Sequence, residues 1–119
     1  EAFARNWSGE DHLERALEKL EKCGNQVTGV TMGVAGSMCL HNGKFIRVPS
    51  VDAGPVVDTT GAGDSYHAAF AIRYSETGDV RGSMAFAAVY AAMKCRKLGA
   101  RAGLPTRAEA EAFIIKEQP

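Results

Sequence analysis

Residues 56 to 65 read Val-Val-Asp-Thr-Thr-Gly-Ala-Gly-Asp-Ser and predict a short strand, a turn of small residues and the start of a helix. Such a junction presents unpaired backbone N–H groups and the positive end of the helix dipole, a combination that binds phosphate. Gly61, Ala62 and Gly63 would let the backbone approach a phosphoryl group directly. Asp64 would repel a phosphate that it faced, so we expect it to face an attacking hydroxyl and accept its proton. The competing interpretation of a lone Gly-x-Gly-Asp is a plain turn with a capping Asp.

Three better-known motifs are excluded at this turn. A dinucleotide fingerprint needs a third glycine at position 66, which is Tyr66. A P-loop needs Gly-Lys followed by Ser or Thr, whereas Gly43-Lys44 is followed by Phe45. The sequence also lacks the Gly-x-Ser-x-Gly elbow of α/β hydrolases. The stretch therefore predicts a phosphate-binding turn of another kind.

Periodicity and turn residues predict the elements around this stretch. Asn42-Gly43 is the strongest short signal for a tight hairpin turn. Helix caps are expected at Ser8 with Asp11, at Asp79, and at Thr106 with Glu109. The expected elements are a helix at 8–23, a strand at 27–34, hairpin strands at 37–41 and 44–48, a short strand at 56–57, and helices at about 61–77, 79–98 and from 106 onward. This order suits a piece of an α/β layered sheet.

The composition is that of an ordinary soluble globular domain. The 119 residues carry a formal net charge of zero, so a nucleic-acid partner is not expected. The sequence has no apolar run long enough to cross a bilayer and no signal-peptide layout, so no membrane association and a cytoplasmic location are expected. Cys23, Cys39 and Cys95 are widely spaced and predict reduced thiols. The start at Glu1, without Met, predicts a cut inside a longer protein.

Three segments resemble one family. Asp58-Thr-Thr-Gly-Ala-Gly-Asp-Ser-Tyr66 resembles the second signature of the ribokinase-like (PfkB) carbohydrate kinases, D-T-x-G-A-G-D-x-F, with Tyr66 as a departure. Residues 30–37 resemble the family's T-x-G-x-x-G strand and loop, and Glu1-Ala2 resembles the end of its N-x-x-E segment. The resemblance covers nearly the whole chain. It implies a Rossmann-type α/β/α sandwich, of which residues 1–119 would be the C-terminal nucleotide-binding part with its β-hairpin, the N-terminal sugar-binding part and lid being absent.

The resemblance also implies roles for individual residues. Asp64 would be the base that takes a proton from a sugar hydroxymethyl group. The anion hole for the transferred phosphoryl group would be Gly61, Ala62 and Gly63. Thr31, Gly33 and Gly36 would lie along ATP. Asp58 and the backbone at Thr60 would help to bind a monovalent cation such as K⁺, and Glu1 would act through Mg²⁺, by way of water.

The implied function is ATP-dependent phosphorylation of a sugar, by a protein of which this chain alone would be inactive. The expected partners are ATP and a small-molecule sugar. Formation of a homodimer remains an alternative. Lys94-Cys95 with Gly99 and Pro105 resembles the tail of ketohexokinase-like and fructokinase-like members, which points to a fructose-like acceptor. A nucleoside or vitamin acceptor stays open. The alternative is a non-catalytic nucleotide-binding module.

Overall fold

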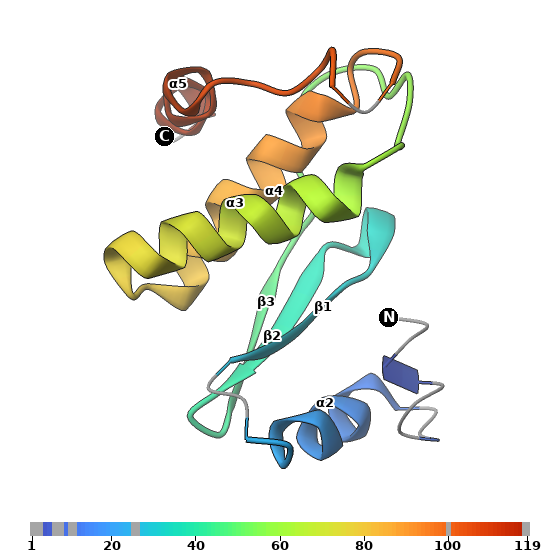
Figure 1. Cartoon of the computed structure of the whole chain (residues 1–119), viewed down its shortest axis with the longest axis vertical. Coiled ribbons are helices and arrows are strands. Elements are labelled where there is room, and N and C mark those ends of the chain that lie inside the picture. The colour runs from blue at the N-terminus through green and yellow to red at the C-terminus, as the bar shows by residue number, and fades with distance from the viewer. Residues whose placement is uncertain (1–3, 6–8, 10–11, 25–26, 100, 118–119) are drawn as a thin grey trace. The chain divides into compact units, whose positions relative to one another are not determined.

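The computed structural model of the chain describes residues 4–5, 9, 12–24, 27–99 and 101–117 (Figure 1). The chain divides into two compact units, Glu1–Pro49 and Ser50–Pro119, and each is described by itself. None of the described helices is both long and apolar enough to cross a membrane.

The first unit is built on a three-stranded antiparallel sheet. Strands β1 (Thr28–Thr31), β2 (Ser37–His41) and β3 (Lys44–Val48) follow one another in the order β1-β2-β3. The β2–β3 turn has Asn42 at φ 51° and Gly43 at φ 74°, the positive values that a two-residue type I′ turn requires. The predicted hairpin is therefore confirmed at the predicted residues.

Helix α2 (Leu13–Glu21) packs its apolar face against the sheet of this unit. Ala16 and Leu17 are fully buried and share a cluster with Met38 and Leu40 of β2. The predicted helix at 8–23 is thus confirmed in its central part. Its expected caps, Ser8 and Asp11, lie outside the described residues, and α2 starts after His12 without a side-chain cap.

The predicted strand at 27–34 is wrong at its C-terminal end. β1 ends at Thr31, and Gly33–Ala35 form a 3-10 turn. Gly33 has φ 58° and Gly36 φ 93°, conformations outside the β region, so the strand cannot continue through them. The amide of Met32 donates to the carbonyl of Gly36 at 2.8 Å and closes the loop that leads into β2.

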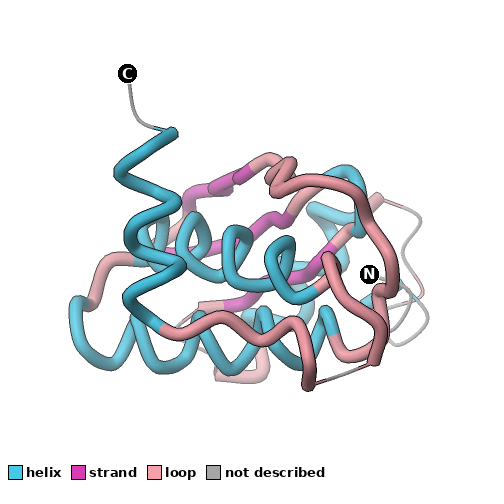
Figure 2. Tube along the Cα trace, turned by 90° about the horizontal axis from the view of Figure 1, so that it is seen from above, coloured by secondary structure: helices cyan, strands magenta, loops and turns pink. Residues whose placement is uncertain are grey.

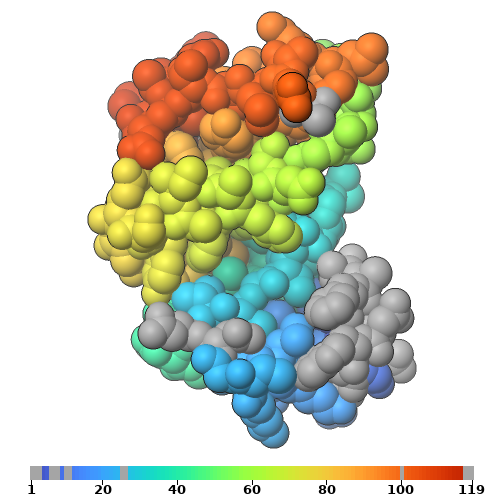
Figure 3. Space-filling model, in the orientation of Figure 1, coloured from blue at the N-terminus to red at the C-terminus, as the bar shows by residue number. Residues whose placement is uncertain are grey.

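The described part of the second unit contains three helices, α3 (Ala62–Thr77), α4 (Val80–Lys94) and α5 (Arg107–Glu117). Its core joins Ala69 of α3, Phe86 and Ala87 of α4, and Ala110 of α5. Arg73 of α3 lies over the Phe86 ring at 4.7 Å and pairs with Glu111 of α5 at 2.8 Å. Side chains of α3 form much of the visible surface of this unit (Figure 3).

The helix ends of the second unit follow the predicted caps, with one exception. Asp79 Oδ1 accepts from the amide of Gly82 at 3.1 Å at the start of α4. Thr106 and Glu109 form the predicted reciprocal box before α5. However, α4 ends at Lys94, short of the expected residue 98, because the next residues turn back with Arg96 N–H on the carbonyl of Met93.

The predicted strand at 56–57 is also wrong. Residues 50 to 61 form a loop along their whole length (Figure 2). Val56 is 69% and Val57 57% exposed, and the amide of Val57 donates to the carbonyl of Cys95 at 2.8 Å. A Val-Val pair has the β propensity of a strand, but a strand also needs a neighbouring strand, and within the described residues this segment pairs with a helix end instead.

Candidate active site

The N-terminus of α3 carries a group of open backbone amides. Gly61, the residue before the helix, has φ 75°, a left-handed conformation that glycine adopts without strain. Among the described residues, no acceptor is found for the N–H groups of Gly61, Gly63 and Asp64. The N–H of Ala62 donates to the carbonyl of Thr59 at 3.0 Å. This end of α3 thus has three open donors, the amides of Gly61, Gly63 and Asp64, whereas the amide of Ala62, also predicted for the anion hole, is engaged.

Gly63 is not required by the packing of this chain. A Cβ built on it would meet no atom within 4 Å, and its φ is not positive. Glycine in a helix is about 0.5–1 kcal/mol less stable than alanine, so the residue costs stability without filling a tight space. The free space lies beside the open amides, where an anionic ligand could approach the backbone.

Asp64 lies in the first turn of α3, next to Gly63. Its side chain is exposed, and among the described residues no hydrogen bond to its carboxylate is found. The carboxylate is therefore free to accept a proton from a bound alcohol, while the adjacent amides are free to bind a phosphoryl group. The competing interpretation, a capping Asp, predicts a bond from a helix amide to the Asp64 carboxylate, which the described part of the structure does not contain.

Asp58 organises the loop that leads into α3. Its Oδ1 accepts from the amide of Thr60 at 2.9 Å and from the Thr60 hydroxyl at 2.6 Å, and its Oδ2 accepts from the amide of Gly99 at 2.8 Å. The Thr60 hydroxyl bond, followed by the two amide bonds and the charge of Lys94, lowers the pKa of Asp58 from 3.8 to about 2. The carboxylate is therefore ionised and held in one orientation at neutral pH.

Lys94 and Cys95, at the end of α4, anchor the same loop. Lys94 is fully buried, and its Nζ donates to the backbone carbonyl of Asp58 at 3.0 Å. The carbonyl of Cys95 accepts from the amides of Val57 at 2.8 Å and Asp58 at 3.1 Å. The sequence had not singled out this role of Lys94, although a lysine that ends an Ala-rich, mostly apolar helix is a signal for a buried, paired ammonium group.

The predicted nucleotide-binding residues lie in the first unit. Thr31 ends β1, opposite Ser37 of β2, and Gly33 starts the 3-10 turn, where an added Cβ would meet no atom within 4 Å. Gly36 differs, because a Cβ there would collide with the carbonyl of Val48 and lie 2.9 Å from Cα of Pro49. The lack of space for a Cβ is therefore enough to require glycine at position 36. At position 33 there is space, and only the positive φ favours glycine.

The metal prediction for Glu1 falls outside the described residues. Within the described ranges, no three His, Cys, Asp or Glu side chains come together as a metal-binding group. The open amides beside Gly63 could bind a phosphate. Mg²⁺ in nucleotide sites takes several of its oxygen ligands from the phosphates themselves, so a cluster of protein carboxylates is not needed to hold it.

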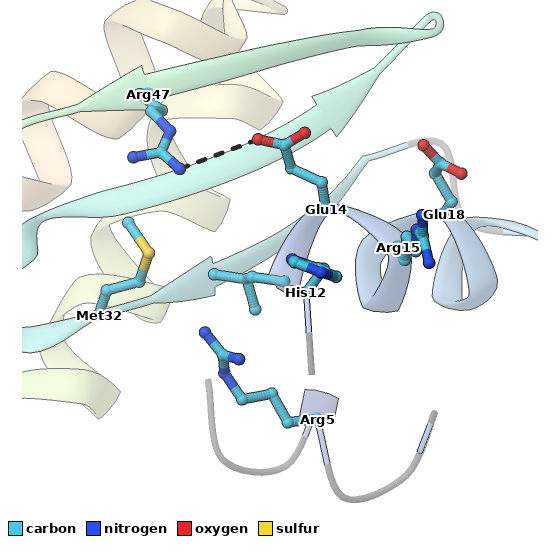
Figure 4. Close-up of a pocket in the computed structure, with 8 residues that line it drawn as sticks. Arg5, His12, Glu14, Arg15, Glu18, Met32 and Arg47 are labelled. Atoms are coloured by element: carbon cyan, nitrogen blue, oxygen red, sulfur yellow. Dashed lines mark ion pairs between the residues drawn. The ribbon is translucent and has the colours of Figure 1, made fainter. Parts of the chain in front are cut away.

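A hollow of about 550 Å³ lies in the first unit (Figure 4). Arg47 of β3 and Glu14 of α2 approach each other there, with Nη2 and Oε1 4.0 Å apart. The residues that line it are Arg5, His12, Leu13, Glu14, Arg15, Glu18, Met32 and Arg47. It contains none of the predicted site residues, and its lining includes both basic and acidic side chains, so its charge does not select one class of ligand.

Comparisons with known proteins identify the family of this chain. The model of the pfkB family of carbohydrate kinases matches residues 2–107. The ribokinase of Bacillus subtilis (strain 168) is 38% identical over 85 residues, which cover 71% of this chain and 29% of the relative. The ribokinase of Lactococcus lactis subsp. lactis (strain IL1403) is 37% identical over 101 residues, covering 83% and 33%. The chain thus spans about a third of the length of these curated relatives.

The fold is shared as well. The structure of Arabidopsis thaliana ribokinase complexed with ribose and ATP matches with a TM-score of 0.88 at 30% identity, covering 96% of this chain and 38% of that chain. The expected ribokinase-like α/β fold is therefore confirmed. With the family model matching most of its residues, the chain belongs to the pfkB family of carbohydrate kinases.

Proposed function

We propose that the protein transfers the γ-phosphoryl group of ATP to a primary hydroxyl group of a sugar, with Asp64 as the general base. The observation that carries the proposal is the first turn of α3, where an exposed carboxylate stands beside open backbone amides. Phosphoryl transfer depends mainly on positioning and on donors aimed at developing charge. This turn offers a donor surface and a base within adjacent residues.

The roles divide between the backbone and the side chain. The N–H groups of Gly61, Gly63 and Asp64 bind the oxygens of the transferred phosphoryl group, and the bare Gly63 leaves room for it. The Asp64 carboxylate accepts the proton of the sugar hydroxyl as its oxygen bonds to phosphorus. Ala62 keeps the turn closed through Thr59. Bound Mg²⁺ would neutralise charge on the phosphates.

The remaining nucleotide contacts are proposed for the first unit. Thr31, Gly33 and Gly36 would lie along ATP, with Gly33 as the residue whose open surroundings leave room for a ligand. Residues 1–119 would form the C-terminal nucleotide-binding part of the kinase. The acceptor is proposed to be a pentose, since the two curated relatives described above are ribokinases, which replaces the fructose-like expectation from the tail.

Asp64→Asn in the intact protein tests this function. The amide cannot accept a proton, so we expect kcat to fall by about 10²- to 10⁴-fold, while ATP binding measured by calorimetry is kept. The readout is ADP release over a panel of ribose, deoxyribose, fructose and nucleosides. Asp52→Asn is the matched control: it makes the same chemical change in an exposed loop and can keep the Oδ1 bond to the amide of Gly54.

The outcomes separate the alternatives. Unchanged turnover in Asp64→Asn would remove Asp64 from the chemistry. A wild-type protein that binds ATP but phosphorylates no member of the panel would be the non-catalytic nucleotide-binding module instead. A protein that does not bind ATP would refute the proposal as a whole.

A further inference from the structure

The side chain of Lys94 is an ammonium group enclosed within the second unit. It is fully buried and contacts the backbone carbonyl of Asp58 at 3.0 Å. A buried charge is costly unless it is paired and hydrogen-bonded. The chain nevertheless places a lysine here, at the last residue of α4, which suggests a specific task for its charge.

The surroundings hold this ammonium group in place. Gly103 passes so close to the backbone of Lys94 that an added Cβ would collide with its carbonyl oxygen and lie 2.8 Å from its carbonyl carbon. Between these residues, Gly99 N–H binds the Asp58 carboxylate at 2.8 Å. The segment after α4 therefore closes around the loop that contains Asp58, and Lys94 lies at the base of that closure.

The groups around the Lys94 ammonium are negatively charged or carry partial negative charge, so they stabilise a cation at this position. The Asp58 carboxylate is one of them, and the charge of Lys94 contributes to its ionised state. The carbonyl groups at the C-terminus of α4 form the negative end of its dipole. Backbone carbonyls and carboxylates are also the ligands of alkali cations, so an ammonium group and a K⁺ ion would compete for the same partners.

The residues at Asp58 and Thr60 therefore do not fit the monovalent cation that the family resemblance implied. Both atoms of the Asp58 carboxylate are engaged by N–H and O–H donors of Thr60 and Gly99. The backbone carbonyl of Asp58 already accepts from the Lys94 ammonium group at 3.0 Å, and this ammonium group would repel a second cation.

We propose that Lys94 is a positioning residue whose ammonium group takes the place of a monovalent cation, so that this protein needs no K⁺. Lys94 holds the carbonyl of Asp58, Asp58 orients Thr60, and the carbonyl of Thr59 receives the amide of Ala62 at the start of α3. The ammonium group thereby fixes the direction of the open amides and of Asp64. The catalytic consequence rests on the proposed kinase function, whereas the cation preference of the folded protein does not.

The test compares cations in the intact protein by two readouts, the melting temperature and ADP release with the best sugar of the panel. Chloride salts of K⁺ and of tetramethylammonium, each at about 0.1 M, keep the ionic strength and its screening equal. For the wild type we expect the same Tm and the same kcat, within about twofold, in both salts. Lys94→Ala removes the charge and opens a space at the Asp58 carbonyl, so we expect a lower Tm and at least a tenfold loss of kcat.

The decisive result is the cation response of Lys94→Ala. K⁺ or NH₄⁺ should raise its Tm and restore part of its kcat, whereas the larger tetramethylammonium ion should not. A lysine with a packing role alone would show no such selectivity. Lys97→Ala is the control, because Lys97 is an exposed lysine on the same segment, and this variant should behave as the wild type in every salt.

Several outcomes would overturn the proposal. A wild type that melts higher in K⁺ than in tetramethylammonium, or that turns over several-fold faster in K⁺, still uses a free cation. Equal responses of Lys94→Ala to both salts would reduce Lys94 to a packing residue. If Lys94→Ala does not fold, Lys94→Met retains most of the side-chain volume, and the wild-type comparison stands by itself. A wild type without turnover refutes the kinase function, while the melting comparison still decides the role of Lys94.

Discussion

Replacing Gly63 by alanine is expected to stabilise the protein and to impair it as a kinase. Gly63 lies in the first turn of α3 with ordinary φ, and apart from its two chain neighbours and the backbone of its own helical turn, the new methyl group would meet no atom within 4 Å. The folded chain therefore accepts the substitution without strain. The same methyl group would occupy the space beside the open amides, where the transferred phosphoryl group is proposed to lie.

The two effects have opposite signs and can be sized separately. Alanine is favoured over glycine in a helix by about 0.5–1 kcal/mol, and restriction of the unfolded chain by a Gly→Ala change gives a similar figure of about 0.4–1 kcal/mol. We therefore expect Tm to rise by a few degrees. Alanine keeps the N–H of residue 63, but its methyl group would hold the phosphoryl group away from these amides. Loss of one donor contact to a developing oxyanion typically lowers kcat by about 10²- to 10³-fold, and because the contact is displaced rather than removed, we expect at least a tenfold loss for Gly63→Ala.

Calorimetric melting and ADP release on the intact protein measure both effects. Ala71→Gly is the matched control, because Ala71 is exposed on the same helix, two turns beyond Gly63. It should lose about as much stability as Gly63→Ala gains and should keep kcat. If Gly63→Ala is more stable but equally active, the phosphoryl group does not approach this part of α3. If it is less stable, the free space beside Gly63 is not available in the folded protein.

Two further predictions concern the ends of the helices. The hydrogen bonds to Asp58 lower its pKa from 3.8 to about 2, so its stabilising effect is fully present above the unfolded-state pKa and is lost as the pH falls toward 2. Asp58→Asn should therefore flatten the decline of Tm over this acid range, and a decline as steep as that of the wild type would contradict this. Asp79→Ala should cost about 1 kcal/mol because the amide of Gly82 loses its acceptor, whereas Asp79→Asn should retain most of the stability. Equal losses of Tm in both variants would show that the cap is not the cause.

Local signals in the sequence predicted the parts of the fold that depend on neighbouring residues. Asn42-Gly43 forms its tight turn because both residues adopt positive φ at low cost. Asp79 starts α4 because its side chain reaches an amide three residues later. Gly78, with φ 68°, ends α3 where expected. In each case the interaction is complete within a few residues, so the pattern contains all the information needed.

The errors arose where distant residues decide the structure. The Val56-Val57 pair has strand propensity, but its amides meet the end of α4 at Cys95. That same contact explains why α4 stops at Lys94 rather than near residue 98: the segment after it turns to bind Asp58 through Gly99. Neither outcome is readable from a window of the sequence, since residues of the loop and of the helix end, nearly 40 positions apart, determine each other.

The candidate site shows the same division. The glycine-rich turn and Asp64 could be predicted from residue type, because open amides and a carboxylate at a helix start follow from backbone geometry alone. The engaged amide of Ala62 could not, because it depends on how the turn closes on Thr59. The direction of the open amides depends in turn on Asp58, which the C-terminus of α4 holds through Lys94 and Cys95. The C-terminus of α4 thus positions the N-terminus of α3, and the buried ammonium group of Lys94 connects the two. A change at the contact between Lys94 and Asp58 would alter the position of Asp64 although neither residue contacts it. The cation response of the Lys94→Ala variant therefore probes the site more directly than the stability of that variant does.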